Sequence, residues 1–530
     1  MLLDLPVEII SEVLIHIDHL DILNCSIVCK QLYALITSSL NLQYRIELAA
    51  DGLIDGSPGG STPTTASRLE LLLERRVAWR TLRPRQRAVV ALAGHCHAYE
   101  LVGGLFAKAL EEYGAARRLV ASWLPSNASD EKRLIVDDLG VRIKDFALDP
   151  AQDLIVLLEH RPATGPSANM SSPAGSDIRV HLRKLSAGVL APHPAAKNPV
   201  LCRCAPGPVH GCMIQIVEDV VGMYFWMPFH GVLIWNWMTG EELVVLHSRG
   251  SGARTYMGFS FLSPRAYMVT TLKDDGEIRI YSFASSSSPK RPTHVATLHL
   301  PIRHRHRVLL ELTTTTGPFL ARPPADTPFA SARTARVHVF TLHHDPMPHR
   351  GRWQPACFVV HNRTLMRYVE AYREEDGAAD VPWEEWGPQG TRFFVLAMGF
   401  QWLRYVHGTR VVCPVLQASG ESRVEVLDFN DVHTSREPTA AEKLVATRLG
   451  IDIERPPEGS RLVCEPSVFP AGEIFAKEVV TSLPYYSVPA PGQREPYVGY
   501  MIDEQRLLGL KVRVLLCACH NTRTCRVYFI

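Results

Sequence analysis

The period of the apolar residues changes once along this chain, and that change limits the folds open to it. Between residues 6 and 119 apolar side chains recur at helical spacing, whereas from about Ile135 they alternate in short runs bounded by Gly, Pro, Asp and Ser. A chain of 530 residues also exceeds what one hydrophobic core usually supports. The sequence therefore predicts an α+β multidomain protein, with helices first and an all-β region after them.

The first helical segment is too short to bury all of its own apolar residues. Pro6 suits a first helical turn, Asp21 can cap a second helix, and a third short apolar run follows near Leu32. The apolar positions of these three expected helices are Ile9, Ile10, Val13, Leu14, Ile17, Ile22, Leu23, Ile27, Val28, Leu32, Leu35 and Ile36. Because three helices in about 35 residues bury little, we expect a partner to cover the remainder. The alternative is that this segment caps the domain that follows.

Composition separates a linker from a second helical segment in the rest of the helical part. Residues 51–66 are dominated by Gly, Pro, Ser and Thr, which predicts a linker, and helical spacing returns from Arg68, with a further helix expected at 105–119. The expected domains are a three-helix module at 1–45, a linker at 46–67, a helical connector at 68–134 and a β domain at 135–530. The connector carries arginines at 75, 76, 80, 83, 85 and 87. A solvated face is favoured over a basic patch because no stacking aromatics are interleaved.

The β region shows weak internal repeats. Residues 150–158 and 264–272 share a proline followed by a strand of similar apolar pattern. Strands that end in an aromatic residue and a polar turn recur at 232–237, 276–283 and 423–429, and they resemble the blades of WD-repeat proteins. At about 40 to 50 residues per blade, residues 135–530 would make a β-propeller of six to eight blades.

Charge and cysteine usage narrow the partners and the compartment. The chain has 56 basic and 54 acidic residues, a balance that gives no reason to expect nucleic acid. Residues 220–240 carry no Asp, Glu, Lys or Arg, but the turn residues Pro228 and Gly231 indicate two strands rather than a membrane span. Scattered cysteines in apolar surroundings are typical of reduced thiols, so we expect a cytoplasmic or nuclear protein.

Neither metal nor catalytic motifs are convincing. The candidate clusters are Cys202, Cys204, His210 and Cys212, and Cys517, Cys519, His520 and Cys525. Their spacing fits zinc poorly, and a Cys-x-Cys on a strand puts both sulfurs on one face, as core residues would be. The run at 303–307 alternates Arg with His, and adjacent His343 and His344 point to opposite faces of a strand. No nucleophile elbow or phosphate loop is present, so we expect no metal, no cofactor and no catalysis; the alternative is an enzyme that uses these histidines and cysteines.

Three short motifs carry a specific resemblance. They are Leu5-Pro6-x-Glu8-Ile9-Ile10, Leu20-Asp21-x-Leu23 and Val28-Cys29-Lys30-x-Leu32-Tyr33, in this order. Together they resemble the F-box closely. The resemblance implies that the segment binds the Skp-type adaptor of a cullin-RING ubiquitin ligase. The positions that it places at or near the adaptor contact are Leu5, Pro6, Ile9, Val28, Cys29 and Lys30.

The remainder is similar, more weakly, to fungal F-box proteins in which a Leu-rich connector ending in Trp, here 68–82, leads into an irregular propeller. The resemblance implies a substrate-recognition subunit of an SCF-type ubiquitin ligase, with the β domain holding a protein substrate. The alternative is a scaffold that binds the adaptor without a ligase role. Trp383 and Trp386 could anchor a partner, although packing within an inter-blade loop is slightly favoured.

Overall fold

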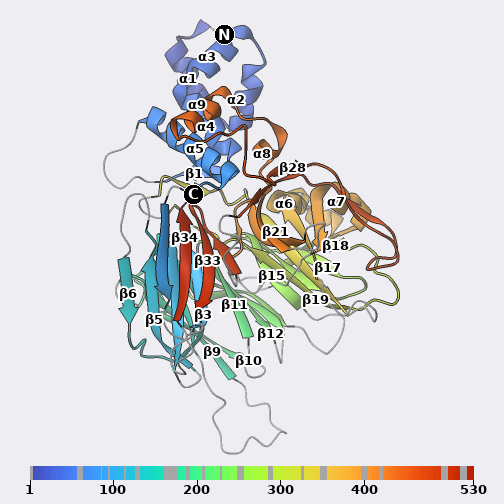
Figure 1. Ribbon diagram of the computed structural model, residues 1–530. Helices are drawn as coiled ribbons and strands as arrows, with labels where there is room; N and C mark the ends of the chain where they lie inside the picture. The colour runs from blue at the N-terminus through green and yellow to red at the C-terminus, as the bar shows by residue number, and fades with distance from the viewer. Residues whose placement is uncertain are drawn as a thin grey trace, which may run out of the picture.

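The protein is described here from a computed structural model. The model describes residues 4–529 apart from 57–63, 85, 93–95, 113–114, 126–131, 160–175, 187–190, 206–208, 210, 227–229, 248–255, 285–290, 321, 324–326, 346–354, 396–403, 417–421, 491–498 and 514–521. Figure 1 shows a group of N-terminal helices standing on a larger body of twisted sheets. The predicted α+β class, with helices before an all-β region, is confirmed.

The N-terminal module has its own small core. Its helices are α1 (Val7–Ile15), α2 (His19–Ser26), α3 (Lys30–Ser38) and α4 (Leu40–Ala50). The core consists of the inward apolar residues Ile10, Leu14, Ile22, Leu32, Leu35, Ile36 and Leu42. Asp18, rather than the expected Asp21, caps α2, since its carboxylate accepts a hydrogen bond from the Leu20 N–H at 2.9 Å. The short third helix is followed by α4, which carries the module past the predicted boundary at residue 45.

The prediction of a linker at 46–67 is wrong for the residues of this stretch that the structure describes. Its first residues complete α4, and β1 (Leu53–Asp55) then pairs with β20 (Phe329–Ser331) of the β region. The long helix α5 (Thr65–Thr81) begins at the cap Thr64, whose hydroxyl accepts from the Ser67 N–H at 3.2 Å. Residues 57–63 lie outside the described part. Gly, Ser and Thr in this stretch therefore serve partly as caps and turns rather than as a free tether.

The predicted helical connector at 68–134 is correct only for α5. Residues 105–119, expected as a helix, instead form parts of two strands, β4 (Leu105–Glu112) and β5 (Ala115–Trp123). Leu105, Ala107 and Ala109 are fully buried, and Phe106 and Lys108 between them are buried too, so both faces of β4 are covered. The segment is rich in apolar and alanine residues, so a helical spacing can be found in it as well. The β region therefore begins at Gln86, not at 135.

Among the described residues the β region is built from seven units of four antiparallel strands, and β23 (Ala379–Val381) and β28 (Arg461–Val463) add a fifth strand to the fourth and sixth units. The eight-stranded sheet is two such units, because β5 and β7 are joined by the single pair Ala116↔Ile143. In chain order the units are β3 (Cys96–Val102), β4, β5 and β6 (Lys132–Val136); β7 (Ile143–Asp149), β8 (Leu154–Glu159), β9 (Ser176–Lys184) and β10 (Val200–Ala205); β11 (Gly211–Val217), β12 (Val220–Trp226), β13 (Gly231–Asn236) and β14 (Glu241–His247); β15 (Tyr256–Ser263), β16 (Ala266–Thr271), β17 (Glu277–Ser282) and β18 (Thr293–His299); β19 (Leu309–Thr316), β21 (Val337–His344), β22 (Ala356–His361) and β24 (Thr391–Val395); β25 (Val406–His407), β26 (Arg410–Leu416), β27 (Ser422–Asp428) and β31 (Tyr485–Pro489); and β32 (Gly499–Ile502), β33 (Arg506–Arg513), β34 (Thr522–Phe529) and β2 (Gln86–Leu92).

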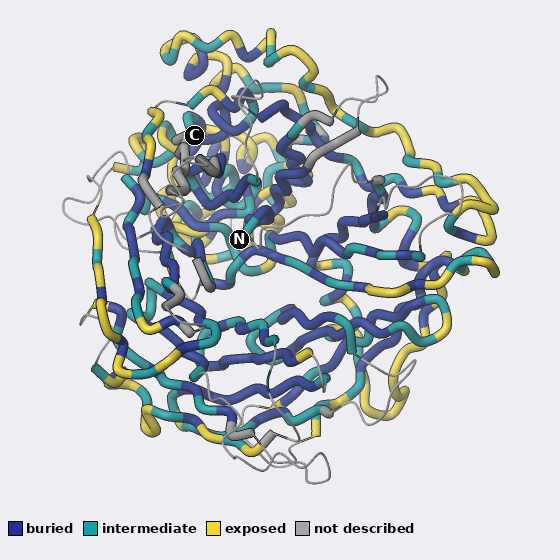
Figure 2. Tube along the Cα trace, turned by 60° about the horizontal axis from the view of Figure 1, so that its bottom comes forward, coloured by how far each residue is buried: buried dark blue, intermediate teal, exposed yellow. Residues whose placement is uncertain are grey.

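These units close into a ring. The last unit takes three strands from the end of the chain and its fourth, β2, from the beginning, with Gln86 opposite Phe529. A buried apolar cluster lies between each unit and the next. The cluster that contains Val90, Leu101 and Leu508 packs the last unit against the first. Figure 2 shows the buried strands inside and exposed segments at the periphery. In the described part of the chain the fold is a seven-bladed β-propeller, within the predicted range of six to eight.

The predicted repeats correspond to equivalent places in the blades. Residues 150–158 and 264–272 both run from the first turn of a blade into its second strand, β8 and β16 respectively. The three aromatic-ended segments are the third strands β13, β17 and β27. The uncharged stretch 220–240 contains the paired strands β12 and β13, as expected. Among the described helices none is long and apolar enough to cross a membrane.

Two blades carry insertions before their last strand. The fifth contains α6 (Asn362–Ala371), β23 (Ala379–Val381) and α7 (Trp383–Gly390), and the sixth contains α8 (Asp431–Ser435), α9 (Ala440–Arg448), β28 (Arg461–Val463), β29 (Ser467–Phe469) and β30 (Val479–Thr481). Trp383 and Trp386 are buried between the fourth and fifth blades, where the Trp386 indole N–H donates to the His299 carbonyl at 2.9 Å. The packing interpretation of these tryptophans is confirmed.

Ring closure can be tested with adjacent valines of β2. Val90 is 1% exposed in the closing cluster, whereas its neighbour Val89 is 64% exposed. Val90→Ala removes two buried methyl groups and leaves a cavity, so we expect a loss of about 2 kcal/mol in the free energy of unfolding. Val89→Ala is the matched control and should change it by less than about 0.5 kcal/mol. Urea unfolding measures both; equal losses would contradict closure through β2.

Candidate docking site on the N-terminal helices

The N-terminal module exposes apolar side chains that its own core does not use. Ile27 and Val28 are 83% and 72% exposed, and Ile9 and Leu5 are 49% and 43% exposed. The other exposed large apolar residues of this module are Val7, Val13, Leu20, Leu23, Tyr33 and Leu40. So many exposed apolar residues on about 35 residues of chain are typical of an interaction surface. We call this set, from Leu5 to Leu40, the apolar face.

The residues that the F-box resemblance selects are placed as follows. Leu5, Ile9 and Val28 lie in the apolar face, Pro6 and Lys30 are exposed, and Cys29 is partly buried. The Pro6 carbonyl accepts hydrogen bonds from the N–H groups of Ile9 and Ile10, so Pro6 starts α1. The Cys29 sulfur accepts from the Leu32 N–H at 3.5 Å and caps α3. Pro6 and Cys29 therefore also shape the helix ends that present the apolar face.

Sequence reasoning placed Leu23, Ile27 and Val28 in the apolar run of the second helix. Helix α2 ends at Ser26, so Ile27 and Val28 lie in the turn before α3, and only Ile22 of that run is buried. Ile27, Leu20 and Tyr33 were not selected as contact residues. The signal that could have selected them is that each lies off the buried helical stripe while being apolar.

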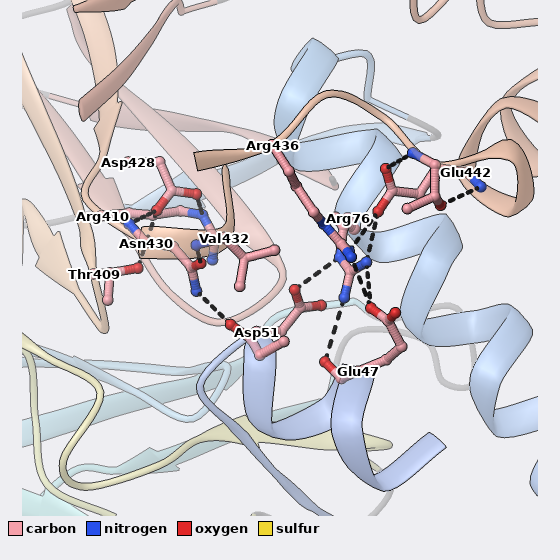
Figure 3. A network of polar contacts seen from close by, with 12 residues as sticks. Glu47, Asp51, Arg76, Thr409, Arg410, Asp428, Asn430, Val432, Arg436 and Glu442 are labelled. Carbon is pink, nitrogen blue, oxygen red and sulfur yellow. Dashed lines mark hydrogen bonds and ion pairs between the residues drawn. The ribbon is translucent and has the colours of Figure 1, made fainter. Parts of the chain in front are cut away.

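The module is joined to the propeller through a buried arginine on α5. Arg76 is 2% exposed, and its guanidinium contacts Asp51 and Glu47 at 2.8 Å and Glu442 at 2.6 Å. Figure 3 shows these carboxylates converging on Arg76 from α4, from the residue after α4 and from α9. Burial alone would lower the pKa of Arg76, but the negative charges of Asp51, Glu47 and Glu442 outweigh it and raise the pKa. Arg76 therefore remains charged in this junction.

A second buried pair lies one residue earlier on α5. Arg75 pairs with Glu504, in the turn between β32 and β33, and the same carboxylate accepts from His407 and from the Ser331 N–H, both at 2.8 Å. Burial raises the pKa of Glu504, but the nearby charges of Arg75 and His407 lower it well below its usual value. The guanidinium of Arg410 pairs with Asp428 and lies 4.6 Å from the ring of Trp79. Thus α5 rests on the sixth and seventh blades.

The interpretation of the connector arginines as one solvated face is wrong for the two at 75 and 76. Both are buried. They pair with Glu504 and Glu442, which lie several hundred residues further along the chain, so the local sequence did not indicate these partners. Arg83 and Arg87 are exposed, and residue 85 lies outside the described part. Glu70, on the same helix, pairs with Arg448 of α9.

The discounted cysteines and histidines are dispersed. Cys202 and Cys204 are exposed on β10 and Cys212 is buried, while His210 and residues 517–520 lie outside the described part. Arg303 and Arg307 are held by ion pairs to Asp275 and Asp345. Among the residues that the model describes, no three His, Cys, Asp or Glu side chains are grouped as metal ligands would be.

One carboxyl among the inner strands has an unusual environment. Asp145, on β7, accepts a hydrogen bond from the Phe146 N–H at 2.8 Å. Burial raises the pKa of Asp145 to about 7, and the charge of Glu100 adds to this, while the hydrogen bond, Arg404 and Lys144 oppose it. Arg404 itself forms an ion pair with Glu100 at 2.5 Å. Asp145 is therefore partly protonated near neutral pH.

The Arg76 junction predicts a large effect on stability. Arg76→Met leaves the carboxylates of Asp51 and Glu442 buried with their main partner removed, so we expect a loss of about 3 to 5 kcal/mol in the free energy of unfolding. The control is Arg448→Met, which breaks the exposed pair with Glu70 and should cost less than about 1 kcal/mol. Similar small losses in both variants would show that Arg76 does not hold the junction.

Asp145 predicts a pH dependence. Its folded pKa lies above its unfolded value of 3.8, so its stabilising contribution is full below pH 3.8 and is lost as the pH rises through about 7. Asp145→Asn keeps an acceptor for Phe146 but cannot ionise. We expect this variant to gain stability relative to the parent chain between pH 5 and pH 8, as thermal unfolding would measure. A pH-independent difference would contradict the raised pKa.

Comparisons with known proteins agree with the geometry at the N-terminus. The family model described as F-box domain matches residues 2–44. No curated protein sequence matches the chain. Among solved structures, Kluyveromyces lactis Hsv2 aligns at 10% identity over 38% of this chain and 60% of its own, less than two thirds, with a TM-score of 0.26.

Two further structures are similar over more of their length. The WD40 β-propeller domain of Doa1 aligns at 11% identity over 64% of this chain and 81% of its own, with a TM-score of 0.27. Chaetomium thermophilum Sqt1, solved with the N-terminus of ribosomal protein L10, aligns at 11% identity over 82% of this chain and 84% of its own, with a TM-score of 0.33. The propeller assignment therefore rests on the strand pairing given above. Residues 2–44 match the F-box domain, and the C-terminal part of the chain is a β-propeller.

Proposed function

We propose that this chain is the substrate-recognition subunit of an SCF-type ubiquitin ligase. Its apolar face would dock on a Skp-type adaptor, and through it on a cullin. The observation that carries the proposal is the exposure of Leu5, Ile9 and Val28 in a module whose own core is already filled by other residues. Burial of such side chains by a partner's helices would supply the favourable free energy of docking. Lys30, exposed beside them, would lie at the rim of that contact.

The propeller would hold a protein substrate on the face away from the F-box domain. In a four-stranded antiparallel blade, the turns after the first and third strands lie on one face, and the other turns lie on the opposite face. Helix α5 contacts Glu504, which lies in the turn after the first strand β32, and Arg410, which directly follows the turn after the first strand β25. Asn430, which follows the third strand β27, donates a hydrogen bond to the Ala50 carbonyl at 3.2 Å. The F-box side is thus occupied, which leaves the opposite face for a substrate.

The proposed mechanism is proximity and needs no catalytic residue in this chain. A substrate held near a ubiquitin carrier reacts at a high local concentration instead of by rare encounter. The buried pairs of Arg75 and Arg76 suit this role, since they fix the docking module relative to the propeller. A subunit of this kind would work in the cytoplasm or the nucleus.

Adaptor docking is tested by charge substitutions in the apolar face. Ile9→Glu and Val28→Glu would put a carboxylate into a desolvated contact, and we expect each to weaken binding to a purified Skp-type adaptor at least tenfold. The control is Leu444→Glu on α9, which changes an equally exposed apolar residue outside the module. Isothermal titration calorimetry measures the affinity. Unchanged affinity for both variants would refute the docking proposal.

The ligase role is tested separately from docking. The chain would be purified with the adaptor and mixed with a cullin, and the three should elute together in size-exclusion chromatography. Val28→Glu is the control that should leave the chain out of the complex. If the adaptor binds but the cullin does not join, the chain acts as an adaptor-bound scaffold, and the ligase proposal fails.

A further inference from the structure

Two thiols lie side by side on the outer edge of the second blade. Strand β10 is the last strand of this blade, and no other described strand pairs with its outer side. Cys202 and Cys204 are both exposed on this strand. The residues at the alternate positions face the third blade: Leu201 is buried, and Arg203 pairs with Glu242 at 2.5 Å. The alternation of the strand therefore turns both cysteines outward. The expectation that this Cys-x-Cys is part of the core is wrong.

The other described cysteines are arranged differently. Cys212, Cys357 and Cys413 are buried, and burial raises the pKa of each thiol. Cys25 and Cys29 are partly covered by the core of the F-box domain. Cys464 is exposed, with no second exposed cysteine beside it in the described sequence. Cys202 and Cys204 thus form the only adjacent exposed pair among the described residues.

The spacing of the pair favours chelation over a disulfide. Residues two apart on a strand have Cα atoms about 6.7 Å apart, at the upper end of the range that a disulfide spans without strain. A bound atom between the sulfurs relieves this constraint, because two bonds of about 2.3 Å bridge a wider gap than one S–S bond. Zinc would need four ligands, and among the described residues these two cysteines are the only candidates at this site. Soft centres that accept two thiolates remain.

We propose that Cys202 and Cys204 form a dithiol site that chelates a soft, thiophilic centre of low coordination number, such as trivalent arsenic. With an organoarsenic oxide the reaction needs no oxidant. Two As–S bonds form, the As=O bond is lost, and the oxygen leaves as water with the two thiol protons. The site does not involve the F-box domain, so a failure of the proposed ligase role would not contradict it.

The test uses the reduced, folded full-length chain and phenylarsine oxide. One equivalent is added, an excess of a monothiol competes, and the retained adduct is located by mass spectrometry. A glutamate-specific protease is required because trypsin would cut after Arg203, between the two cysteines. We expect one phenylarsenic group on the peptide that contains Cys202 and Cys204. A stable adduct found solely elsewhere, including the peptide with Cys517 and Cys519, would overturn the proposal.

Matched variants distinguish chelation from the reaction of single thiols. Cys202→Ser and Cys204→Ser should each reduce the retained adduct at least tenfold, because a single As–S bond exchanges with the competing monothiol. Cys464→Ser removes an exposed but isolated thiol and should leave retention unchanged. All three side chains are exposed, so thermal unfolding should match the parent chain and verify folding. Equal retention in Cys204→Ser and the parent chain would refute the dithiol site.

Discussion

The structure depends on a cluster of buried charge around Arg76. This guanidinium donates to carboxylates of α4, of the residue that follows α4 and of α9, an insertion of the sixth blade. Arg436 bridges two of the same carboxylates, contacting Glu47 at 3.1 Å and Glu442 at 3.2 Å. Glu442 also closes the capping box of α9 with Thr439. The start of the inserted helix and the end of the F-box module are therefore fixed by the same few side chains.

The N-terminal region contacts the propeller through buried ion pairs as well as apolar packing, and it keeps a separate set of apolar residues exposed. Its internal junction with the propeller uses buried ion pairs, whereas its outward face presents Ile9, Ile27 and Val28 to solvent. An exposed apolar face suits a partner that associates and dissociates, because its burial is favourable without needing one orientation. A buried ion network is sensitive to orientation, since each charge must be paired to offset its desolvation. A fixed junction beside exposed apolar residues is what the docking proposed above requires.

The F-box domain, the strand repeats and the two strands within 220–240 could be predicted from the sequence, because each depends on local spacing. The sequence could not show that Arg75 and Arg76 are buried, since Glu504 and Glu442 lie far along the chain. Residues 105–119 were misassigned because alanine-rich runs fit both periods. The proposed contact residues Leu5, Ile9 and Val28 came from motif resemblance, whereas Ile27, the most exposed of the apolar residues, was placed in the apolar run of the second helix.

The position of the insertions explains why the junction between the F-box domain and the propeller contains a buried ion pair beside its apolar contacts. Helix α9 leaves the sixth blade between its third and fourth strands and returns to the same blade, so its ends are fixed while its middle must reach α5. Its apolar contacts with α5, through Val445 and Ala446 against Val77, would tolerate sliding along the helix. The contact of Glu442 with Arg76 does not, because a shift of one turn would leave a carboxylate buried without a partner. Charge pairing therefore selects one register, and with it one orientation of the F-box domain on the propeller.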